Sequence, residues 1–325
     1  MSNLEKDPAE LVLGTTPESD RPDVVEVLTA REVPLGGARA MLVHRTLPQR
    51  GRPTIGAWCF ADHYGLGDGA AQPMVVPPHP HTGLQTASWL FSGEIEHRDS
   101  VGSLSLVQPG ALNLMTAGRG ISHSEVSQAA SGTPHGVQLW IVLPDDARHS
   151  EPFFERRGAV PVQVGDASLQ VFAGTFAGVG PDASVFTPLV GAQVDLPPFG
   201  STELSLDPTF EHGLLVDAGP LRVNGVEAAV TELAYLSPGR VSVHLSAGES
   251  GARALLLGGA PFEERFIMWW NFIGRTHEEI VAFRSEWQGD VIAGADPYGP
   301  FGEVDYDGSP LPAPPMPTVR LKPRS

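Results

Sequence analysis

Hydrophobic residues in this chain occur in short stretches separated by turn residues. Between Val24 and Pro144, apolar or alternating stretches such as 86–91, 103–107 and 137–143 lie between Gly and Pro positions. Short runs bounded in this way are typical of β-strands. A second series of the same kind follows, at 169–172, 193–196, 214–216, 232–236, 241–245 and 254–257. The pattern predicts two successive β-barrels or sandwiches.

The two series share the spacing of their turn residues, which gives a weak internal repeat. Turn geometry requires Gly and Pro at fixed places, whereas the residues on strand faces change more freely. The match therefore favours a duplicated β-unit. The matched positions are Gly93, Pro109-Gly110 and Gly118 in the first series, and Gly219, Pro238-Gly239 and Gly248 in the second.

One helix is predicted near the end of the chain. Thr276 and Glu279 form a T-x-x-E capping box, in which the hydroxyl caps the first turn and the acid lies three residues later. Ile280, Phe283 and Trp287 then recur on one helical face. This short amphipathic helix is the exception in a chain that otherwise predicts strands.

These patterns divide the chain into four parts. Residues 1–23 mix acids, Pro and Ser and are expected to form a loose arm. A first barrel is predicted at 24–150 and a second at 151–295. The Pro- and Gly-rich residues 296–325 predict an extended tail over the body of the protein. We expect an all-β protein with two tandem barrels and few short helices.

The composition restricts the possible binding partners of the protein and its cellular compartment. A formal charge of -17, from 38 acidic and 21 basic residues, would repel a phosphate backbone, so we expect no direct nucleic-acid binding. Cys59 is the single cysteine, which excludes an intrachain disulfide and a thiolate-rich zinc site and fits a reducing compartment. No signal peptide and no apolar run of about 20 residues is found, so we expect a cytoplasmic protein without a membrane span.

Histidines are concentrated in the first half of the chain. His79-Pro80-His81 is the sharpest pattern, because residues i and i+2 of a strand point to the same face and both imidazoles can reach one ion. His123-Ser124-Glu125 repeats this spacing with a carboxylate in the second place. Six of the eleven histidines lie within 73 residues, between positions 63 and 135: His63, His79, His81, His97, His123 and His135.

Three imidazoles and one carboxylate form a mixed nitrogen and oxygen ligand set. Such a set suits iron, manganese, nickel, copper or zinc, and the residues alone do not choose among them. A His-x-His pair by itself is as often structural as metal-binding, but its combination with His-x-Glu favours a metal site. With four protein ligands, a six-coordinate ion would keep two positions for water, dioxygen or substrate.

Three motifs that follow one another in this order resemble the pirin family. They are PPHPHTG at 77–83, SGEIEHRDS at 92–100 and MTAGRGISHSE at 115–125; WWNF at 269–272 is also similar to bacterial pirin-like proteins. The resemblance implies a bicupin fold with one non-haem iron, Fe(II), in the N-terminal barrel; Mn, Ni, Cu or Zn stay as alternatives. It implies the ligands His79, His81, His123 and Glu125, the same four that the spacing indicates.

The resemblance also implies an activity. Quercetin 2,3-dioxygenase cleaves a flavonol with dioxygen, and Glu125 would act as ligand and as the base that deprotonates the flavonol 3-hydroxyl. The alternative is a metal- or redox-dependent regulator that binds a protein partner without catalytic turnover. Phosphate-binding loops and G-x-S-x-G elbows do not occur in the sequence, so nucleotide hydrolysis and serine esterase chemistry are set aside.

This sequence departs from the general cupin pattern at Gln85, where many metal-binding cupins place a glutamate. In the pirin arrangement the carboxylate comes from the motif at 115–125, so the departure puts a role of Gln85 beside the metal in doubt. Aligning the repeats places Ser205 and Asp207 opposite His79 and His81. The same alignment places Arg253 opposite His123, so we expect no second metal site of this kind.

A few other polar residues have two interpretations each. His97 and Asp99 either orient a metal ligand or form a solvated turn with Arg98. His63 either lines the entrance to the metal or belongs to the core of an aromatic strand. Arg119 either binds an anionic group of a substrate or, as we expect, pairs with a neighbouring acid such as Glu125 or Asp99.

Overall fold

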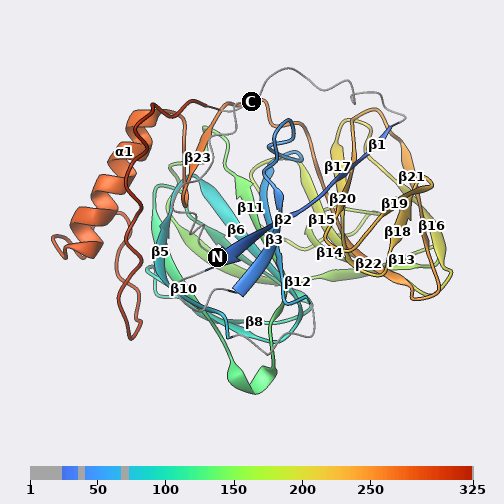
Figure 1. Ribbon diagram of the computed structural model, residues 1–325, viewed down its shortest axis with the longest axis horizontal. Coiled ribbons are helices and arrows are strands. Elements are labelled where there is room, and N and C mark those ends of the chain that lie inside the picture. The colour runs from blue at the N-terminus through green and yellow to red at the C-terminus, as the bar shows by residue number, and fades with distance from the viewer. Residues whose placement is uncertain (1–23, 36–40, 67–72, 324–325) are drawn as a thin grey trace.

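The computed structural model describes residues 24–35, 41–66 and 73–323 and shows two β-barrels side by side (Figure 1). The predicted arm at residues 1–23 lies outside the described residues. Helix α1 (His277–Glu286) lies on the outer side of the first barrel (Figure 1). The prediction of an all-β protein with two cupin barrels and few helices is confirmed.

The first barrel is built from a large and a small antiparallel sheet. Its strands are β2 (Arg31–Leu35), β3 (Met41–Leu47), β4 (Trp58–Tyr64), β5 (Val75–His81), β6 (Leu84–Ser92), β7 (Ile95–Asp99), β8 (Leu104–Val107), β9 (Ala111–Thr116), β10 (Ile121–Ser127), β11 (His135–Val142) and β12 (Phe153–Gly158). The large sheet has the order β12-β9-β6-β11-β4-β3-β2, and the small sheet has the order β5-β10-β7-β8. A short 3-10 turn, η2 (Ala129–Ser131), precedes β11.

The second barrel repeats this arrangement. Its strands are β1 (Val25–Leu28), β13 (Val160–Val164), β14 (Ala167–Gly174), β15 (Leu189–Leu196), β16 (Ser201–Ser205), β17 (Glu211–Ala218), β18 (Leu221–Val223), β19 (Val226–Ala228), β20 (Leu233–Leu236), β21 (Ser242–Ala247) and β22 (Ala252–Gly259). The large sheet has the order β1-β20-β17-β22-β15-β14-β13, and the small sheet has the order β16-β21-β18-β19. The two orders correspond strand by strand, as the repeat of turn residues predicts.

The two large sheets exchange their edge strands. β1 comes from the N-terminal end of the chain but pairs with β20 of the second barrel, with Val25 opposite Leu236. β12 follows the first barrel in sequence and pairs with β9, with Phe153 opposite Thr116. β1 thus falls in the predicted first domain but pairs within the second barrel, and β12 falls in the predicted second domain but pairs within the first barrel. The division into domains at residues 24 and 150 stays a prediction.

Aromatic residues join the two barrels through one continuous core. The Trp58 indole N–H lies 3.2 Å from the carbonyl oxygens of both Val190 and Gly258 in the second barrel. Trp89 stacks on Phe172 with ring centroids 4.7 Å apart. Each tryptophan is fully buried, so the contact between the large sheets excludes water and fixes the barrels relative to each other.

The C-terminal region returns to the first barrel. The predicted cap is confirmed, because the Thr276 hydroxyl accepts a hydrogen bond from the Glu279 N–H at the start of α1. A π-helical turn, η3 (Trp287–Ile292), continues the helix, and the hairpin β23 (Ile267–Trp269) and β24 (Phe272–Gly274) precedes it. Beyond η3, the Leu311 N–H donates to the carbonyl of Pro78 on β5. The tail thus lies over the strands that carry the predicted ligands.

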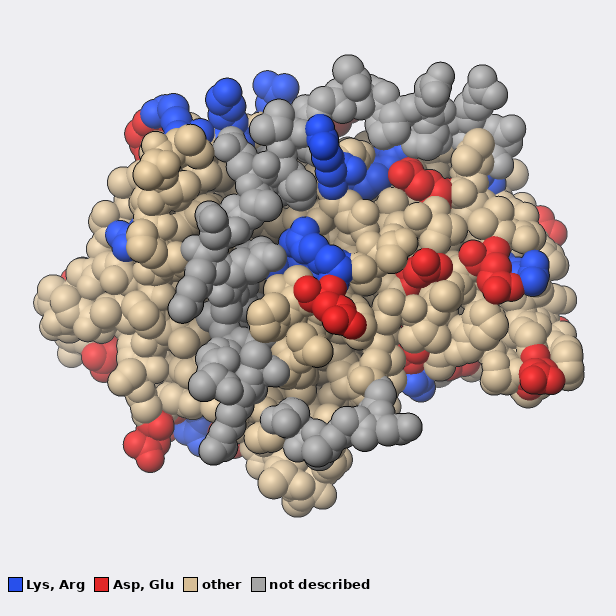
Figure 2. Space-filling view, in the orientation of Figure 1, with Lys and Arg blue, Asp and Glu red and all other residues tan. Residues whose placement is uncertain are grey.

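The surface carries charges of both signs. On the face shown in Figure 2, acidic and basic side chains are scattered among uncharged ones and do not gather in a single patch. In the part of the chain that the structure describes, no helix has the length and apolar character needed to cross a membrane.

Candidate metal centre

The pairing of β5 with β10 brings the predicted histidines together inside the first barrel. His123 lies opposite His79 and Ile121 lies opposite His81 in this antiparallel pair. The ring centroids of the three histidines are 4.3–5.1 Å apart, and one ligand nitrogen from each lies within 4.8 Å of the other two. His79 and His81 of the first i, i+2 pattern and His123 of the second therefore converge on one point.

Glycines shape the loop that leads into β10. Gly118 has φ +52°, in the left-handed region, and a Cβ atom there would collide with the Ser150 carbonyl. The Gly118 carbonyl accepts a hydrogen bond from the N–H of Gly83, just after β5. Glycine at both places fixes the junction at which β5 ends and from which the chain enters β10.

Backbone carbonyls fix the ring orientation of the two histidines on β5. His79 Nδ1 lies 2.9 Å from the Pro77 carbonyl oxygen, and His81 Nδ1 lies 3.2 Å from the Asn271 carbonyl oxygen. Since a carbonyl only accepts hydrogen bonds, each Nδ1 carries the proton and each Nε2 keeps a free lone pair. Pro80, between the two histidines, has no N–H to donate to a neighbouring strand, so it suits an edge or an irregular segment of the sheet.

The third histidine is oriented by a chain of side chains on β7. His123 Nδ1 lies 3.3 Å from His97 Nδ1, and His97 Nε2 lies 3.1 Å from Asp99 Oδ2. Asp99 Oδ1 in turn accepts the backbone N–H groups of Val101 and Ser103. When His123 Nδ1 carries a proton, it donates to His97 Nδ1, and His97 Nε2 donates to Asp99 Oδ2. His123 Nε2 then keeps its lone pair. His97 and Asp99 thus orient a predicted ligand, and Arg98 pairs with Glu96 and Asp305 instead.

The Nε2 atoms of His79, His81 and His123, called here the three open nitrogens, are buried and have no hydrogen-bond partner among the described residues. Burial lowers the pKa of all three histidines, so the imidazoles are neutral at pH 7. A neutral imidazole with an unused lone pair is a ligand for a divalent transition metal. The donor set fits a metal ion at this point.

Glu125 lies on the same strand but outside the three-histidine group. It is buried, and a β-bulge between His123 and Glu125 places it opposite Val76. Burial lowers the pKa of His79, and the negative charge of Glu125 raises it by a smaller amount. The carboxylate therefore lies near that ring. The ligand atoms that lie within 4.8 Å of one another belong to the three histidines and do not include Glu125. The role of Glu125 as the fourth ligand stays a prediction.

The wall of the large sheet that faces these histidines carries buried polar groups that the sequence analysis did not identify. The Trp140 ring lies 5.1 Å from the His81 ring. Gln138, two residues earlier on β11, and Tyr64, opposite Gly136 on β4, share this inward face. We name Tyr64 Oη, Gln138 Nε2 and Trp140 Nε1 the open donors, since all are buried and none has a hydrogen-bond partner in the described ranges.

The open donors give the interior a defined chemistry. Burial, and next the charge of Glu125, raises the pKa of Tyr64 well above its ordinary value, so its hydroxyl keeps the proton. Buried donors without acceptors are costly in a folded protein and are expected to bind an oxygen-bearing ligand. Alternation along β11 would have placed Gln138 and Trp140 on one face, but the sequence does not tell which face is the interior.

Several other sequence-based interpretations need correction or completion. His63 faces the second barrel, where it contacts Asp217, so it does not line the entrance to the metal. Arg119 pairs with Glu151 instead of Glu125 or Asp99. Gln85 donates hydrogen bonds to the Thr116 hydroxyl and to the Ser184 carbonyl from the second half of the chain.

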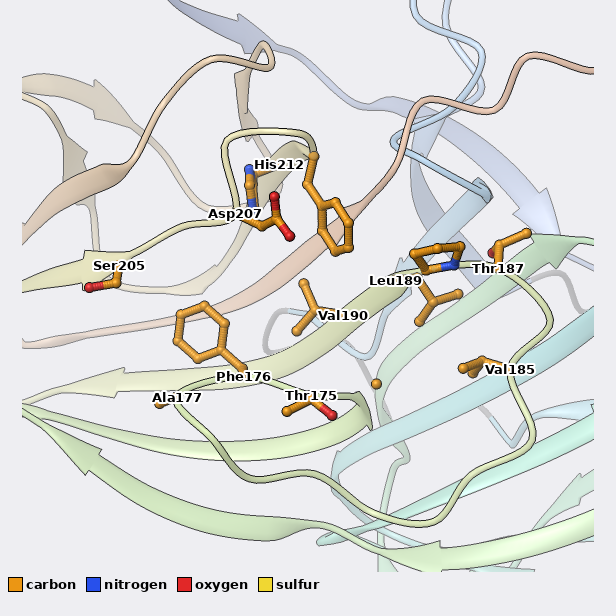
Figure 3. A pocket seen from close by; sticks show the side chains of 13 residues that line it. Thr175, Phe176, Ala177, Val185, Thr187, Leu189, Val190, Ser205, Asp207 and His212 are labelled. Carbon is orange, nitrogen blue, oxygen red and sulfur yellow. The ribbon is translucent and has the colours of Figure 1, made fainter.

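The corresponding place in the second barrel is a cavity of about 410 Å³ (Figure 3). Ser205 and Asp207, the predicted counterparts of His79 and His81, line it together with His212. The alignment of Arg253 with His123 is wrong, because Arg253 lies on β22, the counterpart of β11, whereas β10 corresponds to β21. Glycine spacing misplaced the residue because the connections after the repeated turns differ in length.

Comparison with known proteins gives a consistent result over most of the chain. A family model described as Pirin matches residues 40–141, and one described as Pirin C-terminal cupin domain matches residues 191–291. The chain is 41% identical over 300 residues to a Pseudomonas aeruginosa protein provisionally named a quercetin 2,3-dioxygenase, with coverage of 90% of this chain and 91% of the relative. It is 34% identical over 274 residues to a pirin-like protein of Caulobacter vibrioides, with coverage of 81% and 92%.

Solved structures show the same relationship. A crystal structure of a quercetin 2,3-dioxygenase from Acinetobacter baumannii is similar to this chain with a TM-score of 0.84 and 36% identity, over 92% of this chain and 98% of that chain. A bacterial pirin from Escherichia coli, in complex with nickel(II), shares the fold with a TM-score of 0.58 and 19% identity, over 74% and 100% of the two chains.

Proposed function

The chain belongs to the pirin family, and we propose that it is a metal-dependent dioxygenase of the quercetin 2,3-dioxygenase type. Its site would lie inside the first cupin barrel. His79, His81 and His123 would hold one divalent metal ion through the three open nitrogens, and Glu125 would supply a carboxylate. Iron(II) is the favoured ion.

The observation that carries this proposal is the set of three open nitrogens facing the open donors. Three lone pairs without a partner on one wall fit a metal ion, and three donor groups without an acceptor on the opposite wall fit an oxygen-rich ligand. A flavonol supplies several carbonyl and hydroxyl oxygens on a flat ring system. When held by His79, His81 and His123, the metal would supply Lewis-acid chemistry toward the flavonol oxygens and redox chemistry toward dioxygen.

The residues of the chain would orient the substrate and move one proton. The Glu125 carboxylate would accept the proton of the flavonol 3-hydroxyl, as its position on the ligand strand suggests. Tyr64, Gln138 and Trp140 would donate hydrogen bonds to oxygens elsewhere on the substrate. Phe60 stacks on Trp140 with ring centroids 4.1 Å apart and holds that donor in place. The buried surroundings would strengthen each of these interactions.

The relatives support the proposal. The provisional name of the Pseudomonas aeruginosa relative and the Acinetobacter baumannii structure both refer to quercetin 2,3-dioxygenase, and both proteins match this chain over nine tenths of its length. The Escherichia coli pirin with nickel(II) supports a divalent ion in this fold.

The test is turnover of quercetin by protein of defined metal content. Apo-protein is loaded separately with Fe(II), Mn(II), Ni(II) or Cu(II), and quercetin consumption is followed together with oxygen uptake. We expect turnover above that of the free ion with at least one metal, and loss of this turnover in the His79→Ala variant. Activity no higher than that of free metal with all four ions would refute the proposal.

A further inference from the structure

A second group of metal-ligand side chains lies where the two barrels meet. His63 on β4 and His135 at the start of β11 come from the first barrel, and Asp217 on β17 comes from the second. One ligand atom from each lies within 4.8 Å of the other two. His63 is opposite Val137 in the β4–β11 pair, and thus on the face of the sheet that points away from the first metal centre.

Both imidazoles approach the same carboxylate oxygen. His63 Nε2 lies 2.7 Å and His135 Nε2 lies 2.6 Å from Asp217 Oδ1. The two rings are stacked, with centroids 5.6 Å apart and an angle of 12° between their planes. Two nitrogens and one oxygen therefore point into a single small space from two separately formed barrels.

The hydrogen bonds of this group are incomplete. His135 Nε2 is buried and forms an ion pair with Asp217 Oδ1, but the alignment of the two groups is not that of a hydrogen bond. The His63 ring is fully buried, whereas 19% of the His135 side chain is exposed. An ion could thus enter along His135, and water could complete its coordination there.

The carboxylate is held from its other side. Arg253 donates to Asp217 Oδ2 at 2.5 Å, and the guanidinium lies 4.4 Å from the centre of the Phe91 ring. A hydrogen bond to one oxygen of a metal-binding carboxylate leaves the second oxygen oriented for the ion. Asp195 lies opposite Arg253 in the β15–β22 pair, and its charge offsets that of the guanidinium.

We propose that His63, His135 and Asp217 form a second divalent transition-metal site that joins the two barrels. Two imidazoles and one carboxylate with free positions are a ligand set for zinc and for non-haem iron. The site is independent of the proposed dioxygenase activity, because its ligands lie on the other face of the large sheet. Bound metal would link strands β4 and β11 to strand β17 and stabilise the docking of the barrels.

The competing interpretation is an ion-pair group without metal. In a tetrahedral zinc site, nitrogen and oxygen ligands about 2.1 Å from the ion lie roughly 3.4 Å from one another, which exceeds the present distances of 2.7 and 2.6 Å by about 0.7 Å. Small rotations of the His135 and Asp217 side chains would supply this difference. The two interpretations differ in metal stoichiometry, which can be measured directly.

The experiment uses the full chain, stripped with a chelator and dialysed against Zn(II), with bound zinc measured by mass spectrometry. Wild type is expected to bind two equivalents, and a His79→Ala/His123→Ala variant is expected to retain one. Adding His135→Ala to that variant removes the remaining equivalent. His135 is the partly exposed ligand, so its loss perturbs the fold least, and circular dichroism verifies folding. Asp217→Asn provides a second variant with the same expected loss.

Melting temperature gives an independent readout. Zinc should raise the melting temperature of the His79→Ala/His123→Ala variant and leave that of the variant carrying His135→Ala unchanged. Retention of zinc after His135→Ala would place the ion elsewhere and overturn the proposal. A His79→Ala/His123→Ala variant that binds no zinc would also overturn it and leave an ion-pair group alone. Neither result depends on whether the protein oxidises quercetin.

Discussion

His123 lies directly opposite His79 across the β5–β10 pair, with ring centroids 4.3 Å apart. Because cross-strand neighbours on one face are held by the ladder hydrogen bonds, the approach of these rings is fixed by the backbone. His81 joins them through the i, i+2 spacing on β5. The three proposed ligands thus need only two strands, which leaves the remaining walls of the barrel for the substrate of the proposed function.

Removing one of these rings should release metal from the first barrel. His79→Ala leaves two of the three open nitrogens, and we expect bound metal to fall by about one equivalent per chain while the fold is retained. Mass spectrometry of the purified variant measures the change. His149→Ala, at an exposed histidine, is the control and should keep the wild-type metal content. Equal metal in both variants would contradict the site.

The chain from His123 through His97 to Asp99 should control metal affinity. His97→Phe keeps the aromatic contact with Phe154, whose ring lies 4.5 Å from that of His97, but removes the partner of His123 Nδ1. We expect metal affinity to fall about 10- to 100-fold, as for other groups that orient a ligand. Competition with a chromogenic chelator measures it. Glu96→Gln on the same strand is the control, and unchanged affinity in His97→Phe would refute this role.

Docking of the barrels should depend on the Trp58 indole N–H. Trp58→Phe leaves the buried carbonyls of Val190 and Gly258 without this donor, whereas Trp140→Phe removes an N–H that has no partner in the described structure. Both changes lose similar packing, so the difference isolates the hydrogen bonds. We expect Trp58→Phe to lower the free energy of unfolding by about 1–2 kcal/mol more than Trp140→Phe does. Equal losses in urea unfolding would argue against this.

Acid should destabilise the second barrel through His212. Burial lowers the pKa of this histidine to about 4, against the opposing charge of Asp207, from an ordinary value of 6.5. As pH falls the unfolded chain takes up the proton first, so stability is complete above pH 6.5 and is lost toward pH 4. The full loss is about 3 kcal/mol.

A non-titrating side chain should remove this pH dependence. We expect the stability of His212→Gln to fall less steeply than that of wild type between these pH values, as measured by urea unfolding at each pH. The comparison with wild type cancels the titration of the carboxylates elsewhere. Parallel curves for the two proteins would show that His212 is not the group responsible.

Much of the fold and of the histidine site follows from sequence because both depend on short-range patterns. The i, i+2 spacing of His79 and His81 on an extended segment already determines that they share a face. Glycine turns at matching intervals predict the duplication. The exchange of β1 and β12 between barrels does not follow, because edge pairing depends on contacts far apart in sequence that no local pattern specifies.

Contacts between the barrels account for most of the remainder. The sequence allows His63 to be interpreted as a residue at the entrance to the metal site, because its partner, Asp217, is 154 positions away and no local pattern connects the two. Tyr64 belongs to the interior wall only because β4 pairs with β11, and its neighbour His63 faces the other barrel for the same reason. Alternation indicates that adjacent residues face opposite ways, but the pairing of whole sheets decides which way is inward.

Substitution of Tyr64 should separate the effect of its hydroxyl on substrate binding from its effect on the stability of the fold. Its buried hydroxyl has no partner among the residues described, so Tyr64→Phe should leave the free energy of unfolding unchanged or raise it by about 1 kcal/mol. If the hydroxyl donates to substrate, kcat/KM for quercetin should fall about 10-fold or more. Tyr235→Phe is the matched control, because that hydroxyl donates to Glu211 at 2.9 Å in the second barrel. The control should lose stability and keep its activity. A stability loss in Tyr64→Phe would reveal a hidden structural partner, and unchanged kcat/KM would exclude Tyr64 from substrate binding.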